Sequence, residues 1–289
     1  MLRSIVLACL VIAFSNSYSQ SQPQKVAPGI ISDDGVFGFT LSPDGKSGFW
    51  VKSNGRRDTL MIMESSLVSG KWKTPTPAPF SGNPQWKDID PVFSPDGNTI
   101  LFQSTRPVKG NPGRDGFDIW AVRRTKNGWS EPYHLGDGIN GDASESYASM
   151  TSRGDIYFMK EDPNGEGSSD IFVSRLINQK YTTPASVGSP INTSNRESNP
   201  FISADESFII YFSSDSTGYG EVDLFISFFD GAAWLSPRNM GMKINSEDAE
   251  FCPFFHEKQG RLYFARQRKQ PDRFVENIYS VDVDINEFR

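Results

Sequence analysis

A motif that returns at a regular interval constrains this chain more than any other feature of its sequence. Ser42-Pro43-Asp44-Gly45 is repeated as Ser94-Pro95-Asp96-Gly97, 52 residues later. Degraded copies follow at 151–154, 203–206 and 256–260, and every copy precedes a short apolar and aromatic segment. Proline fixes φ, aspartate can bond the local backbone and glycine accepts positive φ, so the motif predicts a tight turn before a strand.

Three further signals recur in phase with this turn. A second strand opens with a small polar or acidic residue, as at Asp118-Ile119-Trp120, and an aromatic-x-x-Pro signal follows, as at Trp129 and Pro132. The pair Ile-Asn then returns at 139–140, 191–192 and 244–245. Gly82-Asn83 stands in the equivalent place of the first unit. Five units of roughly 53 residues, each with four strand-like segments, account for nearly the whole chain.

The repeat predicts the architecture. One four-stranded sheet cannot bury both of its faces, whereas several sheets packed around a common axis can. The last unit stops after Ile278-Tyr279-Ser280-Val281 without its aromatic-x-x-Pro strand, and Lys25–Ser32 resembles the missing segment. An N-terminal strand in the last blade would close the ring and hide both sheet edges. We therefore expect an all-β protein, a single β-propeller of five four-stranded blades, with six blades as the alternative.

The N-terminal residues indicate export. Residues 1–19 have the pattern of a secretory signal peptide: Arg3, the apolar run Ile5–Phe14 and the small-x-small site Ser17-Tyr18-Ser19. The apolar run is too short to span a bilayer. Cleavage near Ser19 would send residues 20–289 to the periplasm or the cell exterior as one propeller domain. Its repeats are expected at about 37–90, 91–146, 147–199, 200–252 and 253–288, with 25–36 completing the last blade.

Composition excludes several classes of function. The net charge of −6 argues against nucleic-acid binding, which needs clustered lysine and arginine. Two histidines and two cysteines leave little material for a metal site, and Cys252 alone would remain after export, as a buried thiol without a disulfide partner. The chain contains no G-x-S-x-G elbow, P-loop or dinucleotide-binding fingerprint. We therefore predict no catalytic residue, no metal and no cofactor.

The combined motif resembles a known repeat. S-P-D-G, an apolar-aromatic strand, D-I-aromatic, W-x-x-P and I-N-x-x-x-x-E together resemble the TolB-like, WD-like propeller repeat of bacterial exported proteins. The resemblance covers roughly Lys25–Phe288 and implies a propeller. TolB itself looks like a six-bladed propeller preceded by another domain, so the five units found here argue against its envelope-assembly role.

Four acidic residues form the first set of site candidates: Asp88, Glu145, Glu197 and Glu250. Each stands five residues after the asparagine of its unit, and a closed ring would bring them to one mouth of the axial channel. There they could bind a cation, a basic peptide or a polyhydroxylated ligand. The alternative, which we favour because the acid recurs in nearly every blade, is that each accepts backbone N–H bonds at the turn between blades. The first unit departs from the pattern, with Val36 or Phe37 at this position.

Loop residues outside the repeat form the second set. Arg114 lies in the segment 107–116, Tyr219 lies in 215–221, and Arg266 and Arg268 make the last inter-strand loop basic. These loops occupy the same place in successive blades and should gather on one face, where binding residues are common. The recurring aromatic residues are instead expected to pack between blades: Trp72, Trp129, Tyr181 and Trp234.

Two functions fit these features. The favoured one is a non-catalytic binding or scaffolding propeller. It is expected to be monomeric, not to span the membrane, and to meet an envelope or extracellular protein, peptidoglycan or another glycan through its loop face or channel mouth. The alternative is a carbohydrate-active enzyme that uses channel carboxylates. Glycosidases need two carboxyl groups about 5–5.5 Å or about 6.5–9.5 Å apart. Two channel carboxylates above an open pocket, one of them apolar-lined with a raised pKa, would favour the enzyme, and a channel plugged by phenylalanine would argue against it.

Overall fold

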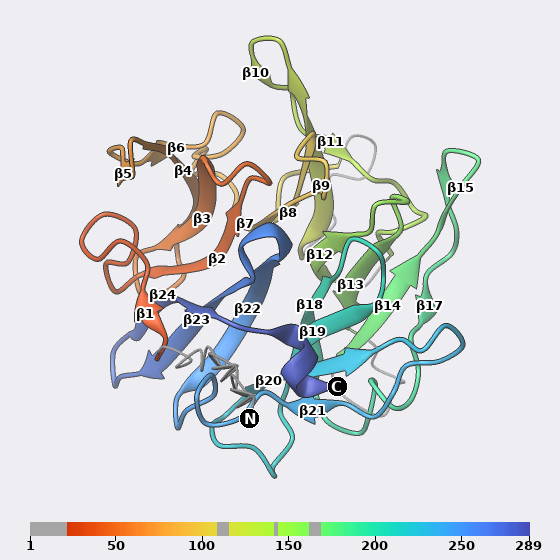
Figure 1. The fold of residues 1–289 in the computed structure, drawn as a ribbon. Helices are drawn as coiled ribbons and strands as arrows, with labels where there is room; N and C mark the ends of the chain where they lie inside the picture. Colours follow the sequence, from red (N-terminus) through yellow and green to blue (C-terminus); the bar gives the residue numbers. More distant parts are fainter. Residues whose placement is uncertain (1–21, 109–115, 142–143, 162–168) are drawn as a thin grey trace, which may run out of the picture.

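The computed structural model describes residues 22–108, 116–141, 144–161 and 169–289. Five antiparallel sheets stand around a common axis, and the chain passes from one to the next around the ring (Figure 1). Their inner strands contact one another in the cyclic order β2, β7, β12, β18, β22. Within the described residues, no helix is long and apolar enough to cross a membrane.

The blades share one order of strands from axis to rim. Blade one contains β2 (Val36–Leu41), β3 (Ser47–Ser53), β4 (Leu60–Val68), β5 (Lys71–Trp72) and β6 (Thr76–Pro77). Blade two contains β7 (Asp88–Phe93), β8 (Thr99–Ser104), β9 (Asp118–Thr125), β10 (Gly128–Trp129) and β11 (Tyr133–His134). Blade three contains β12 (Glu145–Met150), β13 (Ile156–Lys160), β14 (Asp170–Ser174) and β17 (Ala185–Ser186), with a ribbon of β15 (Leu176–Ile177) and β16 (Lys180–Tyr181).

The last two blades complete the ring. Blade four contains β18 (Glu197–Ile202), β19 (Phe208–Ser213), β20 (Asp223–Phe228) and β21 (Arg238–Asn239). Blade five contains β22 (Ala249–His256), β23 (Arg261–Lys269), β24 (Phe274–Asp282) and, from the other end of the chain, β1 (Gln24–Lys25). A 3-10 turn at Glu257–Gln259 joins β22 to β23, and another at Ile285–Phe288 follows β24.

The ring is closed by the N-terminal strand. β1 pairs antiparallel with β24, with Gln24 opposite Ser280 and Lys25 opposite Tyr279 (Figure 1). This strand covers the outer edge of β24, which would otherwise expose unpaired backbone groups. The prediction of five blades closed by an N-terminal strand is confirmed.

The repeated turns behave as their residues require. The Ser42 hydroxyl donates to Asp44 Oδ1 and the Ser94 hydroxyl donates to Asp96 Oδ1, both at 2.6 Å. Gly45 and the equivalent Gly97 both have φ of +72°, a conformation that glycine adopts without the steric cost of a side chain.

The repeated asparagine clamps blades two, three and four to the connection that leaves each of them. Asn192 Oδ1 accepts from the N–H of Ile171 and its Nδ2 donates to the carbonyl of the same residue, both at 2.9 Å. Asn140 makes the same pair of bonds with Ile119, and Asn245 makes it with Leu224. A side-chain amide here replaces one residue of a strand, which satisfies a backbone donor and acceptor at once.

The core lies between the blades and is rich in aromatic rings. The Trp129 ring of blade two meets Phe49 of blade one, with centroids 5.9 Å apart. The Trp234 ring of blade four meets Tyr157 of blade three, with centroids 6.3 Å apart. Edge-to-face contacts of this kind add to the stabilisation that comes from burial. For these two positions, the expected role of the recurring aromatic residues between blades is confirmed.

Candidate functional site

Each inner strand carries a β-bulge two residues after the position of the repeated acid. The register of the strand pair shifts there, as between Ile89 and Val92 in β7. The bulged residue has positive φ in all five blades: Gly38, Asp90, Tyr147, Asn199 and Cys252, with φ between 43° and 59°. We call these five the axial residues. A side chain in this conformation costs on the order of 1–3 kcal/mol, and such residues cluster at functional sites.

Hydrogen bonds join the axial residues across blades. The backbone N–H of Cys252 donates to Asn199 Oδ1 at 3.1 Å, and the Cys252 thiol lies 3.4 Å from Asp90 Oδ1. The Tyr147 hydroxyl donates to the carbonyl of Pro253 at 2.7 Å. Burial raises the pKa of both the Cys252 thiol and the Tyr147 hydroxyl. Both groups therefore stay protonated at neutral pH and act as donors.

Asp90 is the only carboxylic acid among the axial residues. Burial raises its pKa to about 7, and the Cys252 thiol and the Arg57 guanidinium only partly oppose this rise. Gly38 leaves room for it, since a Cβ at Gly38 would lie 2.7 Å from Asp90 Oδ1. This carboxyl group therefore keeps its proton well above the pH at which an exposed aspartate loses it. It can therefore give or accept a proton near neutrality.

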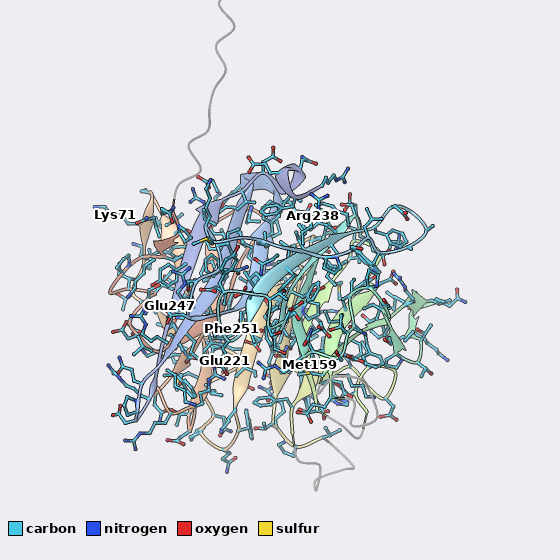
Figure 2. All side chains as sticks on the ribbon, turned by 90° about the horizontal axis from the view of Figure 1, so that it is seen from below. Lys71, Met159, Glu221, Arg238, Glu247 and Phe251 are labelled. Atoms are coloured by element: carbon cyan, nitrogen blue, oxygen red, sulfur yellow. The ribbon has the colours of Figure 1, made fainter. Side chains whose placement is uncertain are left out.

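A polar cavity of about 680 Å³ opens above the axial residues. We call it the axial cavity. Residues of all five blades line it, and Met159, Glu221 and Phe251 among them lie toward the middle of the molecule in Figure 2, whereas Lys71 and Arg238 lie nearer its outline. Seven of its lining residues are ionisable as acids or strong bases: Arg57, Lys87, Arg196, Lys269, Asp90, Glu161 and Glu221. A site of this size and polarity fits a small hydrophilic ligand.

Arg57 is held in place at the wall of this cavity. Its guanidinium forms an ion pair with Glu276, a fully buried carboxylate of β24. It also lies over the rings of Phe37, Phe274 and Phe251, at 4.9, 5.4 and 5.8 Å from their centroids. The ion pair and the three rings restrict its rotamers, so the side chain is ordered before any ligand arrives.

The opposite end of the axis is apolar. The Phe201 and Phe254 rings meet there with centroids 5.7 Å apart. A pocket of only about 110 Å³ remains among apolar side chains such as Leu41 and Val92. Phenylalanine side chains thus fill one end of the axis, while the end above the axial residues is open and polar.

The repeated acids lie behind this cavity and do not line it. Asp88, Glu145, Glu197 and Glu250 are all buried, and each faces the residue directly opposite on the next strand: Ser104, Lys160, Ser213 and Arg266. Asp88, for example, accepts from the Ser104 hydroxyl at 2.6 Å and pairs with Arg106 at 2.7 Å. Glu197 also accepts from the backbone N–H of Thr193. Glu250 likewise accepts from the backbone N–H of Ser246, and none of the four acids lines the cavity.

The loop candidates of the second set lie in different surroundings. Arg266 donates to Glu250 at 2.6 Å, and both guanidinium contacts of Arg268 with Asp248 measure 3.0 Å. Both arginines lie within β23, where a loop was expected, because these ion pairs extend the hairpin beyond its apolar residues. Tyr219 is on a loop and half exposed, and its N–H donates to Asp223. Arg114 lies outside the described residues.

The side chains on the two sides of β23 have different neighbours. Successive residues of a strand point to opposite sides of the sheet. Gln267 and Lys269 line the axial cavity, whereas Arg266 and Arg268 turn toward the acids of blade five. Asp90 was not a site candidate from the sequence, because the five axial residues share no side-chain type. The available signal was a position that changes in every unit of a well-phased repeat.

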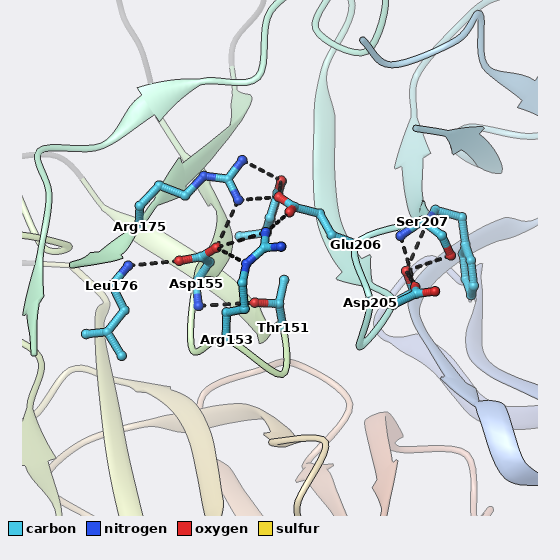
Figure 3. Close-up of polar contacts among 11 residues, drawn as sticks. Thr151, Arg153, Asp155, Arg175, Leu176, Asp205, Glu206 and Ser207 are labelled. Atoms are coloured by element: carbon cyan, nitrogen blue, oxygen red, sulfur yellow. Dashed lines mark hydrogen bonds and ion pairs between the residues drawn. The ribbon is translucent and has the colours of Figure 1, made fainter. Parts of the chain in front are cut away.

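A second group of ionic side chains joins blades three and four at their repeated turns (Figure 3). Arg153 and Arg175 both contact Asp155 of their own blade and Glu206 of the next. Asp155 also accepts from the backbone N–H of Leu176 at 2.9 Å. The network links the blades and leaves both carboxylates paired. Within the described ranges, no three histidine, cysteine or acidic side chains form a group that could hold a metal ion.

Fold and site together define a five-bladed β-propeller with a polar axial cavity. No protein-family model and no curated protein matches the sequence. Among solved structures, the chain is similar to a thermostable family-43 glycoside hydrolase, with a TM-score of 0.60, 12% identity, and 89% of this chain and 92% of that chain covered. It is also similar to the catalytic domain of the GH62 α-L-arabinofuranosidase of Coprinopsis cinerea, with a TM-score of 0.55, 8% identity, and 91% and 96% covered.

TolB from Acinetobacter baumannii is a further structural neighbour, with a TM-score of 0.48, 15% identity, and 85% of this chain covered. The match covers 54% of TolB, so this chain spans about half of its length. All of these identities are low, and the comparisons therefore establish the fold alone.

Proposed function

We propose that this protein is a carbohydrate-active propeller that takes a glycan into the axial cavity and hydrolyses it there. The observation that carries the proposal is Asp90, a buried carboxyl with a pKa of about 7 that lines an open polar cavity. The structural neighbours that are named as glycoside hydrolases share the fold over nearly the whole chain, which supports the same class of function.

The proposed chemistry assigns Asp90 as the proton donor. Hydrolysis of a glycosidic bond needs an acid that protonates the leaving oxygen and a second carboxylate that activates water or attacks the sugar. A carboxyl with a raised pKa suits the first role, because it still holds its proton near neutral pH. Glu161 and Glu221 line the same cavity, and neither carboxylate bonds a group within the described parts of the chain. One of these two is the proposed second carboxylate.

The walls of the cavity supply the remaining contacts of a sugar site. Phe251 and Phe274, which are partly exposed, offer apolar surfaces to the C–H faces of a sugar ring, and Arg57 stands between them and the buried Phe37 as a hydrogen-bond donor. Lys87 and Arg196 add donors on the opposing blades. Export directed by residues 1–19 is part of the proposal, since it would bring the protein to glycans outside the cytoplasm.

Release of reducing sugar from a panel of plant and bacterial polysaccharides tests the proposal. We expect Asp90→Asn to lower kcat by about 10²–10⁴-fold, the range for loss of a general acid. Wild-type activity should also fall as the pH rises through about 7, because Asp90 then loses its proton. Asp272→Asn, which removes an exposed carboxyl from the β23–β24 connection, is the matched control. Cleavage by Asp90→Asn at the wild-type rate would contradict the assignment.

Binding without cleavage is the second candidate, and a specific observation favours it. Four of the five axial residues, Gly38, Tyr147, Asn199 and Cys252, carry no carboxyl group, so the ring itself supplies a single acid. The likeness of the repeat to TolB-like exported proteins supports the same candidate, in which a protein or glycan partner is held and released unchanged. Equal glycan affinity of wild type and Asp90→Asn, with no product from either, would select this function.

A further inference from the structure

A second pocket lies beside the axial cavity, between blades one and two. Its volume is about 280 Å³, and it shares two lining residues, Leu60 and Lys87, with the axial cavity. The rest of its wall includes Asp58, Asn83 and Trp86. A ligand that fills the axial cavity can therefore continue into this second space without leaving the protein surface. We call it the Trp86 pocket.

The pocket lies where blade one lacks the asparagine clamp that blades two, three and four carry. Asn83 occupies the position of the clamp, five residues before the repeated acid, and Ile62 stands where the clamp would bond the strand. The N–H of Ile62 instead donates to the Ser81 hydroxyl at 2.9 Å. Ser81 in turn donates to Asp88 Oδ2 at 2.8 Å. The Ser81 hydroxyl thus accepts from the strand N–H and donates to the repeated acid. Asn83 is therefore not needed to bond the strand.

The released segment carries residues that the repeat does not require. Asn83 Oδ1 accepts from the N–H of Gln85 at 3.0 Å, and within the described residues its amide nitrogen has no acceptor. Trp86 stands where the later units have Ala143, Asn195 and Asp248. A large aromatic residue at this position serves no role that the other blades share.

Trp86 is anchored from one side by a buried arginine. The Arg106 guanidinium lies over its ring, 5.6 Å from the centroid. Arg106 is itself fixed, because it pairs with Asp88 and donates to the carbonyl of Phe80 at 3.1 Å. A ring that is held in one orientation loses little conformational entropy when a ligand stacks on it.

We propose that the Trp86 pocket binds a further sugar ring of the same glycan, so that the ligand is an oligosaccharide that runs from the axial cavity across Lys87 and onto Trp86. The inference rests on the proposed function in one respect only, namely that the axial cavity binds a glycan; it holds whether or not the glycan is cleaved. The indole offers a flat apolar surface for the C–H face of a pyranose. Asp58, Asn83 and Gln85 offer planar acceptors and donors for its hydroxyls.

Calorimetric titration with linear xylo-, cello-, manno- and galacturono-oligosaccharides of one to four units tests this inference. We expect the affinity of the wild type for the sugar that it binds to rise by at least about tenfold between the monosaccharide and the trisaccharide. Trp86→Ala should abolish that increment and leave the affinity for the monosaccharide unchanged. Trp86→Phe should keep most of the increment, because it retains an aromatic face.

The outcomes separate the two proposals. Wild-type affinity that does not depend on chain length, or a full increment in Trp86→Ala, would overturn the Trp86 pocket and leave the axial cavity as the glycan site. Failure of the wild type to bind any member of the four series would overturn glycan binding in the axial cavity, and the inference with it. Thermal melting of each variant shows whether it is folded, and Trp86→Phe provides the comparison if Trp86→Ala is not.

Discussion

The repeated acids and the axial residues lie only two positions apart in the same inner strands, yet they do different work. Asp88 and its equivalents recur as acids, are buried, and bond the residue opposite them within their own blade. The axial residues change from blade to blade, have positive φ, and contact one another across blades. A position that repeats serves the repeat, and a position that varies under the same backbone constraint is free to serve a ligand.

The largest expected effect is on the structural side of this comparison. Asp88→Ala should lower the free energy of unfolding by about 3–5 kcal/mol, because it leaves the nearly buried Arg106 guanidinium without its carboxylate. Urea unfolding followed by tryptophan fluorescence measures the change. Asp88→Asn, which can still accept from Ser81 and Ser104, should lose less. A loss in Asp88→Ala no greater than that of an exposed substitution would show that the acid is dispensable to the blade.

Removing the Asp90 carboxyl should have the opposite effect on the free energy of unfolding. The folded protein keeps the Asp90 proton up to about pH 7, whereas the unfolded chain loses it near the ordinary pKa of 3.8. The folded state therefore binds more protons between these values, and stability falls as the pH rises through this window, by on the order of 4 kcal/mol. The amide of Asp90→Asn does not titrate, so the stability of this variant does not fall for this reason. Its stability relative to the wild type should therefore increase between pH 4 and pH 8.

Unfolding curves of wild type and Asp90→Asn at several pH values provide the measurement. Two stability profiles that run parallel from pH 4 to pH 8 would mean that Asp90 titrates alike in the folded and unfolded chains. A gain in stability at high pH, together with a loss of ligand binding or cleavage, would be the expected exchange of stability for function at a site residue.

The parts of the fold that could be predicted from sequence are those encoded by recurring side chains. The turn at Ser42–Gly45, the asparagine clamp and the aromatic residues between blades recur in phase in most of the units, so their periodicity gives both the number of blades and the closure by β1. The axial site is encoded by a recurring backbone conformation. Gly38, Asp90 and Cys252 share positive φ and nothing else, and φ is not visible in a list of residue types.

The side of a strand to which each side chain points could not be predicted from the sequence either. In β23, an error of one residue exchanges the cavity face for the sheet interior. The extent of this strand depends on ion pairs such as Arg268 with Asp248, whose partners are 20 residues apart and come together only in the folded hairpin. The sequence therefore identifies this stretch as basic. It does not separate Gln267 and Lys269, which line the cavity, from their neighbours.

The clamp allows a sharper comparison between blades. Asn192→Ala removes two hydrogen bonds to Ile171 and leaves its N–H unsatisfied, while its carbonyl still accepts from the N–H of Val187, so it should cost about 1–3 kcal/mol. Asn83→Ala, the equivalent change in blade one, should cost well under about 1 kcal/mol, because Ser81 already satisfies Ile62. Thermal or urea unfolding of the two variants side by side measures the difference. Equal losses would mean that Asn83 still acts as a clamp and would remove the structural reason for the Trp86 pocket.

The smallest expected effect distinguishes the two faces of β23. Arg268→Ala and Lys269→Ala both remove an exposed cation, and neither should move the unfolding midpoint measurably, since exposed ion pairs contribute little to stability. Only Lys269 lines the axial cavity. We therefore expect Lys269→Ala to weaken glycan binding several-fold, and more so at low salt, while Arg268→Ala binds as the wild type does. The reverse pattern would place the ligand on the side of β23 that carries Arg266 and Arg268, the two residues that the sequence selected.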